Sequence, residues 1–442
     1  MISQSSIYGS ILNKNTPPTI EDPVIQIKGT NNNKLSYFMM DESLLSKHMM
    51  LIGGTGCGKT NTFFHIVNQL KNNMKSNDVM IIFDTKGDYY NEFFDSQKDK
   101  VLSAVDKFDG QTVWNVFKDI LSDGDDADSI EANVSEICWS LFSEAIEKNT
   151  SNPFFPNAAR DLLASIITCI IRFTDGKKAL IEKHLNNEFL REKLNSMTAQ
   201  AIYSLLEDYE DQIAVMNYIG DGSNPQGLGV LAEMQAIVRK IFVGAFAKKG
   251  DFSIKEFVRN KGAKTLFIEY DIARGATLTP IYRLLIDLAL KEAMSRKVDG
   301  NVYIFCDEFK LLPQLQHIDD AVNFGRSLGV KVFAGLQSID QLKENYGEAR
   351  ANNLIAGFSS VLSFKANDEA TRTFTSGLYG KNYVLDQYHK IGNNYEEKER
   401  LGNVVEDWEV SMLKVGEAIV GLCNNAPYKF RFDLYQNRRS CL

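Results

Sequence analysis

Five short and nearly continuous apolar runs divide the chain. They are residues 48–53, 79–84, 265–270, 302–307 and 330–336. Runs of this length, bounded by turn-forming residues, are typical of strands that are covered on both faces. Helix-like segments alternate with them, as in a parallel sheet with helices on its faces. We therefore expect an α/β fold with a mainly parallel sheet.

One long stretch breaks this alternation. Between residues 115 and 249 the strand pattern disappears, while helical spacing persists in residues 130–146, 158–173, 180–194 and 199–216. We predict that residues 115–249 are an all-α domain, inserted into an α/β domain of residues 25–114 and 250–442. Residues 1–24 have neither pattern and are predicted to be a flexible arm.

Composition narrows the class of protein. The 442 residues are 44% hydrophobic and carry a net charge of -8, which excludes a uniformly basic surface but not a local basic lining that binds nucleic acid. The 6 cysteines have no metal-ligand spacing, so we expect a reducing, cytoplasmic location. The longest apolar segment, residues 162–173, is shorter than the ~20 residues that span a bilayer, and we expect no transmembrane segment.

A phosphate-binding motif follows the first predicted strand. Residues 53–60 read GGTGCGKT, a complete G-x-x-x-x-G-K-[ST] pattern between a strand and a helical segment. Glycines let successive backbone N–H groups turn toward a phosphate, and the helix N-terminus adds positive potential. We expect ATP as the cofactor, bound by Gly53, Gly54, Thr55, Gly56, Cys57, Gly58, Lys59, Thr60 and Asn61.

Acidic residues at the end of a later strand complete a hydrolytic site. Asp307 and Glu308 follow the apolar run VYIFC, and we expect Asp307 to hold Mg²⁺ together with the Thr60 hydroxyl. Glu308 is placed to orient or deprotonate the attacking water. Gln337 ends the neighbouring strand and is expected to sense the γ-phosphate. The predicted catalytic residues are therefore Lys59, Glu308 and Gln337, and the predicted activity is ATP hydrolysis.

The order of these motifs resembles a known family. The chain is similar, from about residue 28 to residue 435, to the type IV secretion coupling proteins, the TraG/TraD-type conjugative DNA-transfer ATPases of the HerA/FtsK superfamily. The segments that carry the resemblance are HMMLIGGTGCGKT, FDTKGD, TVWNVF, the helical insertion with NPFFPNAARDLL, VYIFCDEFKLLP, FGRSLGVKVFAGLQSIDQL, NNLIAGFSSVLSFKANDEATRTFTSGLYG and LKVGEAIVGLCNNAPYKFRFDLY. Thr85 and Asp88 depart from the Pro and Glu of the family's D-P-K-G-E segment.

The resemblance implies a RecA-like P-loop motor domain with an all-α domain, assembled as a homo-hexamer around a channel for DNA. It also makes Arg326 a candidate to reach a neighbouring subunit's nucleotide, with Arg350 and Arg372 as alternatives. Asp84 and Lys86 are expected at the tip of a strand beside the P-loop strand, in the site or a subunit interface, or in a plain turn.

Three functions remain open from the residues. The first is an ATP-driven DNA translocase that serves a conjugation or type IV secretion channel, with single- or double-stranded DNA and a relaxase as partners. The second is the same motor with a protein cargo. The third is a nucleotide-dependent scaffold or switch with little turnover, against which Glu308 argues. Because family members usually begin with transmembrane helices, a separate anchor or channel protein is expected to hold this chain at the inner face of the membrane.

Overall fold

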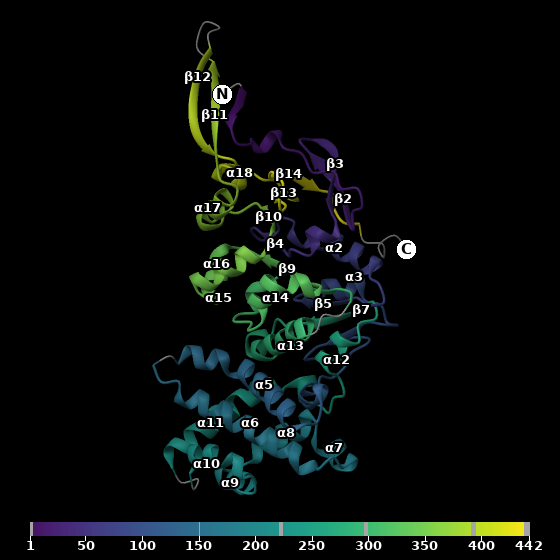
Figure 1. Cartoon of the computed structure of the whole chain (residues 1–442), viewed down its shortest axis with the longest axis vertical. Coiled ribbons are helices and arrows are strands. Elements are labelled where there is room, and N and C mark those ends of the chain that lie inside the picture. Colours follow the sequence, from purple (N-terminus) through teal and green to yellow (C-terminus); the bar gives the residue numbers. More distant parts are fainter. Residues whose placement is uncertain (1–2, 150, 221–223, 296–298, 390–394, 437–442) are drawn as a thin grey trace. The chain divides into compact units, whose positions relative to one another are not determined.

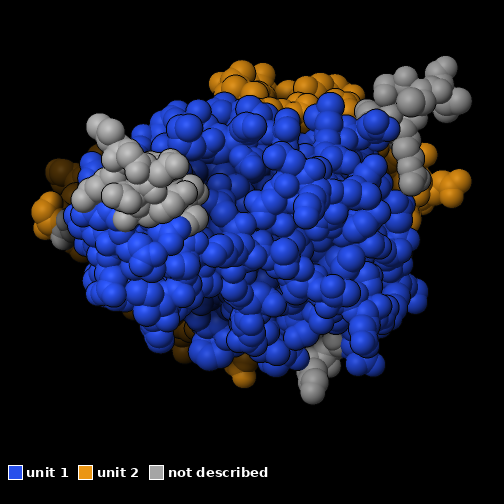
Figure 2. All heavy atoms as spheres, turned by 90° about the horizontal axis from the view of Figure 1, so that it is seen from above, with its two compact units in different colours: residues 1–80, 297–311, 319–442 blue, residues 81–296, 312–318 orange. Residues whose placement is uncertain are grey.

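The computed structural model describes residues 3–149, 151–220, 224–295, 299–389 and 395–436 (Figure 1). The chain forms two compact units, coloured separately in Figure 2. The first unit comprises residues 1–80, 297–311 and 319–442, and the second comprises residues 81–296 and 312–318.

The first unit is built on a mixed sheet. Its strands are β1 (Ser3–Tyr8), β2 (Ile25–Asn31), β3 (Lys34–Met40), β4 (Met49–Ile52), β8 (Val302–Cys306), β9 (Val330–Leu336), β10 (Ser360–Phe364), β11 (Lys381–His389), β12 (Tyr395–Asn403), β13 (Glu417–Gly421) and β14 (Tyr428–Phe432). The strand order is β3-β2-β14-β13-β10-β4-β9-β8. The pairs β8–β9, β9–β4 and β4–β10 are parallel, and the strands beyond β10 are antiparallel.

The parallel centre of this sheet is fully buried. Every residue of β4, β8, β9 and β10 is buried, which explains why three of these strands read as continuous apolar runs. The helices of the unit are α1 (Glu42–Leu45), α2 (Lys59–Asn73), α14 (Ile318–Phe324), α15 (Ile339–Tyr346), α16 (Glu348–Gly357), α17 (Glu369–Leu378) and α18 (Asp407–Ser411), with 3-10 turns η1 (Leu12–Lys14), η5 (Phe309–Leu311) and η6 (Gly325–Leu328).

Part of the predicted flexible arm forms a strand. Residues of β1 pair antiparallel with β11, and β11 pairs with β12, giving a separate three-stranded sheet. The buried Ile11 and Leu12 then join the arm to the core of the unit. The arm carries no strand pattern of its own because its pairing partner lies about 380 positions further along the chain, at Tyr383 to Gln387.

The second unit is mainly helical. Its strands are β5 (Val79–Asp84), β6 (Lys100–Leu102) and β7 (Lys264–Glu269), and its helices are α3 (Asp88–Phe93), α4 (Val116–Ile120), α5 (Ala127–Lys148), α6 (Phe154–Thr174), α7 (Lys178–His184), α8 (Asn187–Ser196), α9 (Ala199–Leu206), α10 (Ile213–Ile219), α11 (Pro225–Ile241), α12 (Ile254–Arg259) and α13 (Gly275–Ser295), with η2 (Leu121–Asp123), η3 (Glu210–Gln212) and η4 (Gly244–Ala247).

The predicted all-α stretch is helical throughout its described part. From residue 116 to residue 247 its regular elements are α4 to α11 and the short turns η2 to η4. Two of the four predicted helices are each divided into two. One is broken at Asn186, whose side chain accepts a hydrogen bond from the Phe189 amide and so starts α8, and the other is broken at η3. The domain boundaries at residues 115 and 249 stay a prediction, since the second compact unit extends beyond them.

One described helix, α6, is long and apolar enough to cross a membrane by length and composition alone. It has 21 residues with a mean hydropathy of 1.4 in its most apolar window. The apolar segment predicted from the sequence was shorter because it began only after the polar residue Asp161. In the structure 61% of that window is buried, and α6 packs against α5 and α11, as a core helix does.

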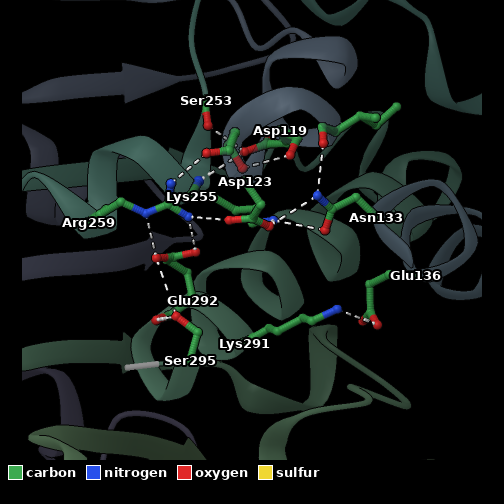
Figure 3. Close-up of polar contacts among 12 residues, drawn as sticks. Asp119, Asp123, Asn133, Glu136, Ser253, Lys255, Arg259, Lys291, Glu292 and Ser295 are labelled. Carbon is green, nitrogen blue, oxygen red and sulfur yellow. Dashed lines mark hydrogen bonds and ion pairs between the residues drawn. The ribbon is translucent and has the colours of Figure 1, made fainter. Parts of the chain in front are cut away.

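A buried carboxylate joins the two ends of the helical stretch. Asp119 on α4 is fully buried and accepts hydrogen bonds from Ser253 Oγ (2.6 Å) and the Lys255 amide (2.9 Å) (Figure 3). It also accepts one from Trp114 Nε1 at 2.6 Å. A buried carboxylate is tolerated when donors satisfy it in this way. Asp119 therefore ties the start of the stretch to the segment that follows it.

An ionic network continues from this carboxylate. Lys255 is 4% exposed, and its ammonium contacts Asp123 and donates to Asn133 Oδ1 at 3.0 Å. Arg259 forms two bonds to Glu292, at 2.9 and 2.8 Å, and one to Asp123 at 2.6 Å (Figure 3). Burial alone would raise the pKa of Asp123, but the hydrogen bonds from Lys255, Asn133 and Arg259 outweigh it and lower the pKa to about 2.

We predict that Lys255→Met lowers the free energy of unfolding by ~3 kcal/mol, because it leaves buried acceptors without their cation. The matched control is Lys248→Met, which removes an exposed ion pair with Asp106 and should change stability by less than ~1 kcal/mol. Urea denaturation measures both changes. Equal effects of the two substitutions would contradict the prediction.

The same network predicts a dependence on pH. The pKa of Asp123 in the folded chain is about 2, below its value in the unfolded chain, so its contribution is present above pH ~4 and is lost as the pH falls toward 2. The stability difference between the parent and Lys255→Met should therefore shrink over that interval. A difference that stays constant from pH 6 to pH 2 would contradict this.

Candidate nucleotide site

The phosphate loop lies between β4 and α2 and depends on glycine at two positions. Gly56 and Gly58 have φ values of +72° and +115°, which side chains rarely adopt. A Cβ atom at Gly58 would also lie 2.9 Å from the Gly416 Cα. The amide of Gly416 donates to the Cys57 carbonyl at 2.9 Å, so the segment before β13 contacts the loop directly.

The start of the loop is fixed by both neighbours of β4. The Gly53 amide donates to the Leu336 carbonyl of β9 at 3.1 Å, and the Gly54 amide donates to the Lys365 carbonyl beyond β10 at 2.8 Å. These bonds do not depend on side chains. The remaining loop, where Gly56 has open space around it, forms the cradle in which backbone N–H groups can meet an anion.

Lys59 lies inside this loop. Its side chain is 7% exposed, and the ammonium donates to the carbonyls of Gly53 (2.6 Å) and Gly54 (3.1 Å). Lys59 begins α2, so the ammonium, the loop amides and the helix N-terminus converge. This arrangement concentrates positive potential where a bound phosphate would lie.

Thr60 and Asp307 form the candidate metal position. The Thr60 hydroxyl donates to Asp307 Oδ2 at 2.7 Å, and Asp307 directly follows β8. A hydroxyl and a carboxylate are oxygen ligands of the kind Mg²⁺ binds, with phosphate and water completing the coordination. No cluster of three or more His, Cys, Asp or Glu side chains that could hold a metal ion occurs in the described part of the chain. The Thr60 hydroxyl and the Asp307 carboxylate fit a magnesium ion that arrives with a nucleotide, because both supply oxygen ligands.

Glu308 and Gln337 are in direct contact. Gln337 Nε2 donates to both carboxylate oxygens of Glu308, at 3.1 and 2.9 Å. The Thr55 hydroxyl contacts Gln337 Oε1 at 3.4 Å, so a phosphate-loop side chain reaches the end of β9. The structure thus brings together the predicted acid, the predicted sensor and the loop.

Asn61 and Cys57 occupy different environments at the loop. Asn61 Nδ2 donates to the Asp433 carbonyl at 3.0 Å and Oδ1 accepts from the Tyr435 amide at 2.8 Å, which holds the chain after β14 against α2. Cys57 is 5% exposed, and its burial raises the pKa of the thiol above the usual value, although Lys59 acts in the opposite direction. Cys57 is therefore a packing residue rather than an activated thiol.

The candidate arginines lie apart from this cluster. Arg326 is exposed in η6, before β9, whereas Gln337 follows β9; a strand of 7 residues separates them by about 23 Å. Arg326 is thus too far from the loop of its own chain to touch its nucleotide. Arg350 pairs with Asp319 at 2.6 Å, and Arg372 pairs with Asp407 at 2.9 Å.

The expectation for Asp84 was wrong in its placement. The neighbours of β4 are β9 and β10, so the strand that ends at Asp84 is not beside the P-loop strand. The Asp84 carboxylate is buried and accepts from the amides of Gly87 (2.9 Å), Lys86 (3.3 Å) and Tyr90 (2.8 Å). Its environment is that of a turn before α3, the alternative named from the sequence. Burial raises its pKa to about 6.

Sequence reasoning missed Lys365 and Gly416, which hold the loop through their backbones. Every residue has a backbone carbonyl, so an acceptor such as that of Lys365 cannot be recognised from the residue type. Gly416 does leave one, because its φ of +78° favours glycine, but a glycine in a turn is too common to be singled out.

Comparison with solved structures shows the same fold. The bacterial conjugative coupling protein TrwBdeltaN70 matches with a TM-score of 0.73 and 21% identity, covering 99% of this chain and 95% of that one. TrwB has also been solved with ADP and Mg²⁺ (TM-score 0.70, 21% identity, 90% and 88% coverage) and with non-hydrolysable GTP and ATP analogues.

Curated relatives belong to the same group. The coupling protein TraD of Escherichia coli (strain K12) is 21% identical over 353 residues, which is 76% of this chain and 44% of TraD. The probable conjugal transfer protein TraG of Sinorhizobium fredii (strain NBRC 101917 / NGR234) is 22% identical over 408 residues, 88% of this chain and 62% of TraG. The chain therefore spans about half the length of these relatives.

A family model settles the relationship. The model described as the type IV secretion-system coupling protein DNA-binding domain matches residues 34–426, nearly nine-tenths of the chain. It covers the phosphate loop, the Asp-Glu pair, the glutamine after β9 and the helices between them. The protein belongs to the type IV secretion-system coupling protein family.

Proposed function

We propose that this chain is an ATP-hydrolysing motor that moves DNA, alone or with an attached relaxase, toward a type IV secretion or conjugation channel. The observation that carries the proposal is the convergence of Thr60 with Asp307, and of Glu308 with Gln337, around one phosphate loop. Family membership supports DNA as the cargo, and the ligands of TrwB support ATP and Mg²⁺ as the cofactors.

The residues of the site have distinct roles in this proposal. The loop amides and Lys59 bind the phosphates, and Thr60 and Asp307 hold Mg²⁺. When bound, Mg²⁺ neutralises charge that develops on the phosphate oxygens. Glu308 orients the attacking water and accepts its proton. Gln337, which contacts both Glu308 and Thr55, links the position of that carboxylate to the occupancy of the loop.

We also propose a homo-hexameric ring with sites between subunits. Arg326 is exposed and lies far from the loop of its own chain, which is the placement required of an arginine that acts on a neighbour. Glu308 favours turnover over the alternative of a scaffold or switch, since a scaffold does not need an acid beside its metal position. The same motor with a protein cargo stays an alternative. Localisation at the inner face of the membrane through a partner belongs to this proposal as well.

The first prediction of this proposed function concerns ATP hydrolysis. Glu308→Gln should bind ATP with the affinity of the parent but lower kcat by ~10²–10⁴-fold, because the general base is lost. Lys59→Ala should weaken ATP binding itself. Steady-state ATPase assays and equilibrium binding measure the two effects. A Glu308→Gln chain that hydrolyses ATP like the parent would support the switch instead.

The second prediction concerns DNA. ATP hydrolysis by the parent should rise when single- or double-stranded DNA is added, and the increase should weaken steeply between 50 and ~200 mM salt because phosphate contacts release counterions. The stimulation should be absent in Glu308→Gln. Hydrolysis that ignores both forms of DNA at every salt concentration would contradict a DNA motor, and a protein cargo that survives nuclease treatment would favour the alternative motor.

The third prediction tests the ring. Lys59→Ala and Arg326→Ala should each be inactive alone, but a mixture should regain part of the activity, because an intact loop then meets an intact Arg326 from its neighbour. Arg350→Ala is the matched control. Because Arg350 pairs with Asp319 within its own chain, any activity that this variant loses should not return when it is mixed with Lys59→Ala. A mixture as inactive as its components would exclude Arg326 from this role.

A further inference from the structure

The strand order gives the phosphate loop two different sides. On one side of β4 lie β9 and β8, which end at Gln337 and at Asp307 with Glu308. These groups mark the end of the site where the γ-phosphate and the attacking water belong. On the other side of β4 lie β10 and β13. A nucleotide whose γ-phosphate faces the acids directs its nucleoside toward this second side.

Two chain segments border the second side of the loop. The first precedes β13, where Gly416 donates to the Cys57 carbonyl at 2.9 Å and accepts from the Phe432 amide at 2.8 Å. Val415 therefore directly precedes a residue that contacts the phosphate loop. Its side chain is nevertheless 69% exposed.

The second segment follows β14. Asn61, in the first turn of α2, binds Asp433 and Tyr435 through its two amide atoms, and His65 Nε2 contacts the Asp433 carbonyl at 3.0 Å. The Tyr435 ring packs edge-on against His65, with centroids 5.2 Å apart. Leu434 lies between these anchored residues, and its side chain is 81% exposed.

The two exposed side chains are brought to the same rim by pairing. Glu417 lies opposite Arg431 in the β13–β14 ladder, and the hydrogen bond from the Phe432 amide to the Gly416 carbonyl continues that ladder toward the loop. Val415 and Leu434 therefore leave the sheet at the same end, next to Cys57 and Asn61. Exposed aliphatic side chains on backbone that is fixed by hydrogen bonds are suited to binding an apolar surface.

We propose that Val415 and Leu434 form the contact for the purine base of the nucleotide. This inference rests on the proposed function, because it extends the same phosphate site. In this arrangement the α-phosphate lies beside Asn61, and the base beyond it packs against these two side chains. Aliphatic groups contact the face of a purine and make no hydrogen bond to its edge, so adenine and guanine are both accepted.

The test separates contact with the base from contact with the phosphates. Val415→Ser, Leu434→Ser and the double variant are titrated with ATP, with GTP and with inorganic tripolyphosphate, which has the phosphates without the nucleoside. We expect the dissociation constants for ATP and GTP to rise by ~5–10-fold in each single variant, since about 1 kcal/mol of apolar contact is lost. The affinity for tripolyphosphate should stay that of the parent.

Trp408→Ser is the matched control. Trp408 is a 58% exposed apolar residue of the neighbouring helix α18, but it lines a different groove, with Asn13 and Arg400. Its substitution should leave the affinities for all three ligands unchanged. A change in Trp408→Ser equal to that in Val415→Ser would overturn the inference, because the effect would then not depend on the rim of the loop.

Other outcomes also decide the question. Parallel weakening of ATP and tripolyphosphate would show that the substitutions disturb the phosphate loop, and this overturns a role in base contact. Unchanged affinity for all ligands, with altered assembly measured by sedimentation, would assign Val415 and Leu434 to a contact between subunits instead. Failure of the parent to bind either ATP or tripolyphosphate would contradict the proposed function itself, a result distinct from failure of the base contact alone.

Discussion

The backbone hydrogen bonds that hold the phosphate loop between its neighbouring strands are the constraint on which the site depends. Gly53 is bound to Leu336 on one side and Gly54 to Lys365 on the other. Each such bond contributes only about 1 kcal/mol, but together they fix the loop relative to both halves of the sheet. In the proposed function, the acids after β8 and the exposed aliphatic groups before β13 and after β14 contact the same nucleotide from opposite sides of the loop.

A second constraint allows a long helical stretch to interrupt the α/β pattern. Asp119 binds Ser253 and the Lys255 amide, so residues 134 and 136 positions apart in the sequence meet in one buried cluster. The ionic network around Lys255 and Arg259 extends this junction to α13. Because the polar groups of this junction bind one another, the helices between its two ends can pack around their own apolar core, which includes the buried face of α6.

The sequence was sufficient to predict the elements whose signal is local. The apolar runs became β4, β5, β7, β8 and β9, and the GGTGCGKT motif became a loop between a strand and a helix. Gln337 was expected at the end of a strand next to the one that precedes Asp307 and Glu308, and the structure pairs β8 with β9 in parallel. The hydrogen bonds between Glu308 and Gln337 were not predicted.

Features that depend on distant pairing could not be predicted in this way. The neighbours of β4 are β9 and β10, and the sequence did not single out β10 as a strand. The strand that ends at Asp84 was therefore wrongly placed beside β4. The strand β1 forms because it pairs with the edge of β11. The sequence YEEKERLGN of β12 is rich in charged residues, and neither β11 nor β12 shows a regular alternation of apolar and polar residues. The anchoring of Leu434 depends on the amide of Asn61, and a single asparagine gives no indication of its partner.

The most direct test of the account is a structure of the Glu308→Gln chain with ATP and Mg²⁺. A triphosphate should lie along the loop from Gly53 to Thr60, with a metal ion bound to the Thr60 hydroxyl. The Lys59 ammonium should move from the Gly53 carbonyl to a phosphate oxygen. A nucleotide bound elsewhere, or a Lys59 ammonium that still donates to the Gly53 carbonyl with ATP present, would contradict it.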